Sequence, residues 1–138
     1  MSTELWAEDL PYWKTSQSTP DTWHDRTVFM IEKAGGLITA SGYGSQGEQS
    51  AYMITFRLDG EQFRIIWPVM PSKTGNVKAA KVQAATMMHH DVKARLVSAQ
   101  VLGARAAFFN WLMLPDGRTA TSVGLAELLP PMLVAPVQ

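Results

Sequence analysis

The sequence feature that most constrains the fold is a pair of alternating runs around the dipeptide Asp59-Gly60. This dipeptide suits a two-residue primed turn, because both central positions of such a turn need a positive φ. The runs at residues 50 to 58 and 61 to 69 therefore predict a β-hairpin. With Leu58 opposite Glu61, one face carries three apolar pairs and becomes the core, namely Phe56 with Phe63, Ile54 with Ile65 and Tyr52 with Trp67. The other face pairs Arg57 with Gln62, Thr55 with Arg64 and Met53 with Ile66.

Helical signals lie on both sides of this hairpin. A helix begins near residue 21, with Asp21 or Thr22 as its cap, and ends at Gly35 and Gly36. A strand at residues 37 to 43 and a glycine-containing turn at residues 44 to 47 follow. Residues 77 to 113 contain no proline and one glycine, which predicts one long helix, or two helices bent near Gly103. Its sheet-covering face is expected to hold Ala80, Ala84, Met88, Val92, Ala99, Leu102, Ala106, Phe109 and Met113.

The predicted fold class is α+β, with an N-terminal helix, a three-stranded antiparallel meander and a long C-terminal helix packed on the sheet. We expect an aromatic arm at residues 1 to 20, a core domain at residues 21 to 114, and at residues 115 to 138 a turn, a short helix and a proline-containing tail. An open sheet of three strands has edges that must be covered, shortened or paired with another subunit. Phe108, Phe109 and Trp111 exceed what one helix face hides and suggest a subunit contact.

Composition excludes several classes of protein. A chain of 138 residues with 46% hydrophobic residues predicts one globular domain. The sequence has no cysteine, which excludes disulfides, thiolate zinc sites and thiol nucleophiles. It has no apolar run of the roughly 20 residues that a membrane helix needs, and its first residues do not resemble a signal peptide. We therefore expect a soluble, cytoplasmic protein.

The balanced net charge hides an asymmetry along the chain. Residues 1 to 63 hold nine acidic against four basic residues, whereas residues 64 to 118 hold eight basic against two acidic ones. This difference indicates polyanion binding or head-to-tail self-association, although charge also fluctuates along ordinary chains. Lys78, Lys81, His89 and Lys93 share about 120° of helical arc, with Lys73 in the loop before them.

Two further motifs carry weaker signals. His89-His90-Asp91 resembles the signature of a metal-dependent phosphoesterase, but neighbouring helical residues point about 100° apart and cannot all bind one ion. The default interpretation is surface or interface histidines. The loop at residues 71 to 76 could present Lys73 and backbone N–H groups to an anion, or be a simple turn with Asn76 as N-cap. It lacks the glycine-lysine triplet of a nucleotide-binding loop.

The hairpin at residues 51 to 69 and the segments Lys78-Ala79-Ala80-Lys81 and Lys93-Ala94-Arg95 resemble the core of the single-strand annealing proteins, the superfamily of the phage Red-beta and Erf proteins and the eukaryotic annealing mediator. This resemblance covers roughly residues 21 to 113. It implies oligomeric rings or filaments that hold single-stranded DNA in a basic groove between sheet and helix, without metal or ATP. The same element order also describes double-stranded RNA-binding domains. The groove residues that the resemblance implies are Arg57, Arg64, Lys73, Lys78, Lys81 and Lys93.

The sequence thus predicts a homo-oligomeric, non-enzymatic protein that binds single-stranded DNA, or RNA, through phosphates in phage-type annealing or recombination. We expect no cofactor, catalytic residue or metal site. The alternative is a structural or adaptor protein that assembles with itself or docks a partner. A metal-dependent phosphoesterase that uses His89, His90 and Asp91 is a third hypothesis.

Overall fold

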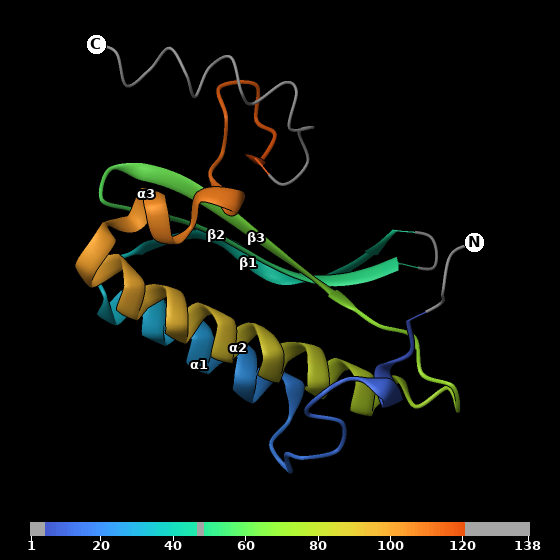
Figure 1. Ribbon diagram of the computed structural model, residues 1–138. Coiled ribbons are helices and arrows are strands. Elements are labelled where there is room, and N and C mark those ends of the chain that lie inside the picture. Colours follow the sequence, from blue (N-terminus) through green and yellow to red (C-terminus); the bar gives the residue numbers. More distant parts are fainter. Residues whose placement is uncertain (1–4, 47–48, 121–138) are drawn as a thin grey trace.

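A computed structural model describes residues 5–46 and 49–120, and it confirms the α+β prediction (Figure 1). A three-stranded antiparallel sheet has the order β1-β2-β3, and helices α1 and α2 lie together on one side of it. Short helical turns precede and follow this core. The elements are η1 (Ala7–Asp9), α1 (Pro20–Lys33), β1 (Leu37–Gln46), β2 (Gln49–Leu58), β3 (Glu61–Val69), α2 (Val77–Leu102), α3 (Ala104–Ala107) and η2 (Phe109–Trp111).

The hairpin has the predicted register. Asp59 and Gly60 both adopt positive φ, 54° and 78°, and Leu58 lies opposite Glu61. All six predicted pairs are present, and the predicted core face packs against the helices. The alternation of the strands therefore leaves Arg57 and Arg64 on the sheet face that points away from α1 and α2.

The ends of the first helix and strand differ from the prediction. Thr19, and not Asp21 or Thr22, caps α1, because Pro20 at the first helical position has no N–H to satisfy and the Thr19 hydroxyl accepts from the Thr22 N–H at 3.2 Å. The predicted turn at residues 44 to 47 is also wrong for its first three residues. They continue β1, because pairing with β2 overrides the turn preference of glycine.

The long helix breaks at the predicted glycine but ends earlier than expected. Gly103 has a φ of 89°, where the Ala104 N–H donates to the Asp59 carboxylate at 3.1 Å. Only the four-residue α3 and the short turn η2 follow, so the predicted continuation of the helix to residue 113 is wrong. Leu102 is 66% exposed and Ala106 is exposed, which removes them from the sheet-covering face. That face consists of Ala84, Ala85, Met88, Val92 and Leu96.

The second aromatic cluster belongs to this domain's own core. Phe108 is fully buried, with its ring 5.3 Å from Phe56 and 5.6 Å from Phe63, and Trp111 is 9% exposed. The predicted subunit contact through these two rings is therefore wrong. Arg95 Nη1 donates to the Ala107 carbonyl at 3.1 Å, which anchors the segment after α2 to the helix.

The arm and the C-terminal turn both dock on the domain. Gln83, 1% exposed, donates from Nε2 to the carbonyl oxygens of Ala7, Leu10 and Pro11. The predicted turn at residues 115 to 117 is confirmed, since the Leu114 N–H donates to the Arg118 carbonyl at 2.7 Å. The short helix predicted near residues 123 to 129 and the proline-containing tail lie outside the described residues. Among the described residues, no helix is long and apolar enough to cross a membrane.

Candidate nucleic-acid interface

The six predicted groove residues lie on different surfaces. Arg57 is exposed and Arg64 donates from Nε to the Thr55 hydroxyl at 3.3 Å, both on the open face of the sheet. The Lys73 ammonium lies 3.0 Å from the Asp9 carboxylate. The Lys81 ammonium lies 4.1 Å from the centre of the Tyr43 ring. Lys78 and Lys93 are exposed on α2.

The space between the sheet and α2 is filled with apolar side chains. Ile54, Ile65 and Met88 are each fully buried there. A strand of nucleic acid has no room between these layers, so a phosphate-binding surface has to lie outside them. The outer surface of the helix layer offers one.

An aromatic and imidazole cluster lies where the arm crosses the two helices. The Tyr12 ring stacks on His90, with centroids 5.0 Å apart and planes inclined by 16°. The centre of the Trp23 ring of α1 lies 5.9 Å from that of His90 and 5.1 Å from that of His89. Its indole N–H donates to the Ser16 hydroxyl at 2.8 Å. Tyr12 is 38% exposed, so this cluster presents ring surface to solvent.

Two cations border these rings. The Arg26 guanidinium lies 5.0 Å from the centre of the Trp23 ring. Burial, and then the nearby charges of His90, Lys93 and Arg26, hold the pKa of His89 below its usual range. Lys93 follows His89 by four residues on α2, so the two side chains are neighbours on one flank of the helix. Arg26 and Lys93 are exposed, and no ion pair neutralises them among the described residues.

A polar hollow of about 420 Å³ lies at the start of α2. Lys14 and Lys78 line it, together with hydroxyls of Ser16 and Ser18. It is next to the capped N-terminus of α2, where Asn76 Oδ1 accepts from the Ala79 N–H at 3.1 Å. Both lysines and the hydroxyls can bind a phosphate oxygen. We call the cluster and this hollow together the arm–helix surface, which comprises Tyr12, Lys14, Trp23, Arg26, Lys78, His90 and Lys93.

The arm is held in an uncommon conformation to reach this surface. Tyr12 and Lys14 have φ of 68° and 55°, a left-handed region that costs most side chains free energy. Gln83 fixes the residues before them, and Glu8 fixes the arm to the loop before α2. Desolvation acts to raise the pKa of the Glu8 carboxyl. Hydrogen bonds from the Ser72 hydroxyl and from the backbone N–H groups of Lys73 and Thr74 outweigh this effect and lower the pKa to about 2.

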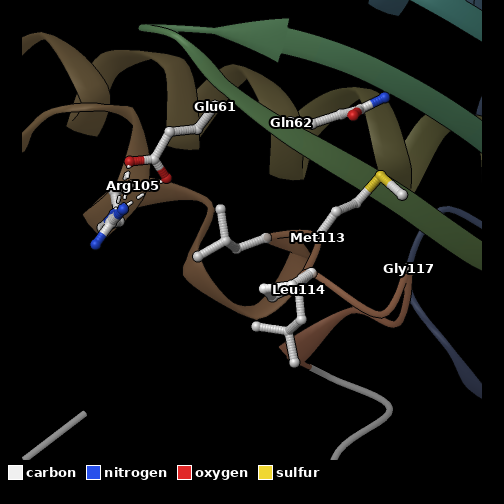
Figure 2. A pocket seen from close by; sticks show the side chains of 8 residues that line it. Glu61, Gln62, Arg105, Met113, Leu114 and Gly117 are labelled. Carbon is white, nitrogen blue, oxygen red and sulfur yellow. Dashed lines mark hydrogen bonds and ion pairs between the residues drawn. The ribbon is translucent and has the colours of Figure 1, made fainter. Parts of the chain in front are cut away.

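A second hollow does not offer free positive charge. It measures about 600 Å³ and lies between β3 and the C-terminal turn. Figure 2 shows Arg105 beside Glu61 on its wall, and the Arg105 Nε donates to both carboxylate oxygens, at 2.7 and 3.0 Å. Leu112, Leu114 and Pro115 supply much of the remaining wall. Its one lining cation is therefore already neutralised.

The tripeptide His89-His90-Asp91 disperses its side chains. His89 Nδ1 lies 3.3 Å from the Thr27 hydroxyl, His90 stacks on Tyr12, and Asp91 accepts from Arg95 Nε at 2.8 Å. Within residues 5–46 and 49–120, no three side chains of histidine, aspartate or glutamate are grouped to hold a metal.

No family model, curated protein or solved structure matches this chain. Any assignment of function therefore rests on the arm–helix surface itself. Sequence reasoning identified Lys78 and Lys93 but missed Tyr12, Lys14, Trp23 and Arg26. The sequence signal for Tyr12 was the density of aromatic residues in the arm, which gave no indication of where the arm docks.

Proposed function

We propose that the protein binds single-stranded nucleic acid along the arm–helix surface, through phosphates and ring stacking, without base-specific readout. The observation that carries the proposal is the exposed Tyr12–His90 stack, bordered by Arg26 against Trp23 and by Lys93 one helical turn along α2, with Lys14 and Lys78 lining the hollow at the start of α2. Rings that stack on bases and cations that track the backbone are how proteins bind single strands of any sequence. The chemistry needs neither metal nor ATP.

The proposal includes the role that the sequence resemblance implies, annealing of DNA strands in phage-type recombination by a cytoplasmic homo-oligomer. An annealing assay with complementary labelled strands tests this role separately from binding. A binding titration with RNA in place of DNA compares the affinities for the two polymers. Because the phosphate contacts are common to both, any difference in affinity has to come from other contacts.

The first experiment is a fluorescence-anisotropy titration of a labelled single-stranded DNA of mixed sequence, with chelator present. Four phosphate contacts, by Lys14, Arg26, Lys78 and Lys93, predict a slope of log K against log salt of about −3. Raising salt from about 50 to about 200 mM should then weaken binding by roughly 50-fold. Absence of binding at the lower salt concentration contradicts the proposal.

Variants that remove positive charge locate the site. Arg26→Ala with Lys93→Ala should weaken binding and lower the magnitude of the salt slope by about 1.4. Arg57→Ala removes a charge from the open face of the sheet, outside the proposed site, and should leave affinity unchanged. Lys78→Ala should weaken binding more than Lys81→Ala, because the Lys81 ammonium already contacts Tyr43. If Arg57→Ala weakens binding as much as the double variant, the sheet face is the site.

A second candidate is a structural protein that assembles with itself, as the alternative from the sequence states. The end of α2 favours it, since Val97, Val101 and Leu102 are 59%, 82% and 66% exposed. Light scattering of the full chain tests whether the protein assembles with itself. A defined oligomer that dissociates on Val101→Lys, in a protein with no affinity for nucleic acid, would favour it over the first.

A further inference from the structure

The two edges of the sheet differ in how they are protected. At the β3 edge, the Met113 N–H donates to the Gln62 carbonyl at 2.9 Å and Leu112 bridges Phe63, beside the side chains seen in Figure 2. Farther along β3, Pro68 has no N–H to offer a new strand. A partner strand therefore finds the β3 edge largely closed.

The β1 edge has neither of these protections. Among the described residues, no backbone hydrogen bond joins β1 to any element other than β2. The ten residues of β1 contain no charge and no proline, which are the usual devices against edge pairing. The one irregularity lies at residue 39, and residues 40 to 46 pair with β2 without interruption. A regular, unpaired strand edge is therefore available.

Helix α1 places acidic side chains beside this edge. Helix α1 contacts β1 and α2 contacts β3, and Lys81 near the start of α2 also reaches Tyr43 of β1. Trp23 and Thr27 turn toward His89 of α2. At about 100° per residue, three acids fall on the opposite flank of α1, over the free side of β1. They are Asp21, Asp25 and Glu32, all exposed and none paired with a lysine or arginine in the described part of the chain.

The other face of the same edge is hollow and mainly apolar. Gly42 and Gly44 leave open space where side chains would stand, since nothing lies within 4 Å of a Cβ built on either. They border a hollow of about 520 Å³ whose wall includes Ala51, Met53 and Ile66. Residues of an added strand alternate between these two faces. One face thus favours positive charge and the other favours apolar side chains.

We propose that the β1 edge binds an extended polypeptide segment in which lysine or arginine alternates with apolar residues, by strand addition. Main-chain hydrogen bonds to β1 supply affinity, and the two faces select the sequence. The basic residues lie toward Asp25 and Glu32, and the apolar residues lie over Gly42 and Gly44. The inference does not depend on the proposed nucleic-acid binding, which uses the opposite flank of α1.

A second copy of this chain fits the same edge less well. Antiparallel pairing of two β1 strands would bring two acidic flanks of α1 toward each other across the interface. Like charges that face each other in this way oppose association. The occupant that satisfies the flank is a basic segment.

The test uses a fluorescent peptide of about ten residues in which lysine alternates with valine, long enough to span the regular part of β1. Matched probes replace lysine with glutamate, or group the same residues in two blocks. We expect the alternating lysine peptide to bind at least tenfold more tightly than either probe, and to protect β1 amides from hydrogen exchange. Equal binding of all three peptides, or none, overturns the proposal.

Two variants secure the assignment. Asp25→Asn with Glu32→Gln should weaken the lysine peptide at least tenfold, whereas the charge-matched control Asp9→Asn with Asp116→Asn should not. Gly42 and Gly44 lie opposite Met53 and Ala51 and bond β2, so the alternate residue Ser41 presents its N–H to the free edge. Ser41→Pro should abolish binding, and circular dichroism shows whether this variant folds. The acidic-flank variant gives the answer even if it does not, because its side chains are exposed. A dimer that Ser41→Pro dissociates would assign the edge to a second copy instead.

Discussion

Gln83 connects the stability of the domain to the geometry of the proposed site, and Gln83→Met tests that connection. The side chain is 1% exposed, and its Nε2 lies 2.7, 3.3 and 3.0 Å from the carbonyl oxygens of Ala7, Leu10 and Pro11. Methionine preserves the length and apolar stem but supplies no donor. The variant therefore removes the polar anchor of the arm with little change in packing.

The size of the effect follows from which carbonyls remain buried. Ala7 is fully buried, and leaving its carbonyl unpaired costs about 1–3 kcal/mol. Leu10 and Pro11 are partly or fully exposed, so water replaces most of their lost hydrogen bonds. We expect a total of about 2 kcal/mol, which for a chain of this length lowers Tm by roughly 6 °C.

Thermal unfolding followed by circular dichroism measures this loss, and limited trypsin digestion reports the arm directly. Cleavage after Lys14 should be faster in Gln83→Met, and affinity for single-stranded DNA should fall because Tyr12 and Lys14 lose their fixed position. Gln100→Met, an exposed change on the same helix, is the control. If the two variants melt within about 2 °C of each other and are cleaved after Lys14 at the same rate, the anchoring role is wrong.

Three further predictions concern the core and pH. Phe108→Ala should lower the free energy of unfolding, measured in urea, by about 3–5 kcal/mol. Phe109→Ala changes a partly exposed position and should lower the free energy of unfolding much less. Equal losses would contradict the assignment of Phe108 to the core. Because the pKa of Glu8 is lowered to about 2, its carboxylate stabilises the fold at pH values above its ordinary pKa of 4.5, and the difference between the wild type and Glu8→Gln should vanish as the pH falls toward 2 in denaturant titrations. The pKa of His89 is lowered in the folded state, so unfolding takes up protons and stability should decline as the pH falls below 6.5; a His89→Gln variant with the same decline would show that another group is responsible.

Local signals in the sequence predict most of this fold. The Asp59-Gly60 turn and the alternation around it determine the register, because a shift of one residue would expose Phe56 and Phe63. Gly103 marks the helix break because its φ of 89° is costly for other residues. What followed the break was not predictable from propensity. Residues 104 to 113 have helical composition, but the burial of Phe108 and Trp111 bends the chain back.

The candidate site was less predictable than the fold, because it depends on contacts between distant residues. Tyr12 meets His90, and Glu8 meets Ser72, although each pair is more than sixty residues apart in the sequence. Charge counting identified all the lysines and arginines but could not tell that Asp9 neutralises Lys73 or that Tyr43 holds Lys81. Which cations remain free depends on tertiary structure.

The docking of the arm has a consequence for the order of assembly during synthesis. Residues 7 to 11 leave the ribosome before their partners, since Pro71, Ser72 and Gln83 follow more than sixty residues later. The hairpin has its contacts within a much shorter stretch of chain and can form first. The nascent arm therefore waits, with Trp6, Tyr12 and Trp13 accessible to chaperones, until the first turns of α2 emerge and complete the surface to which it binds.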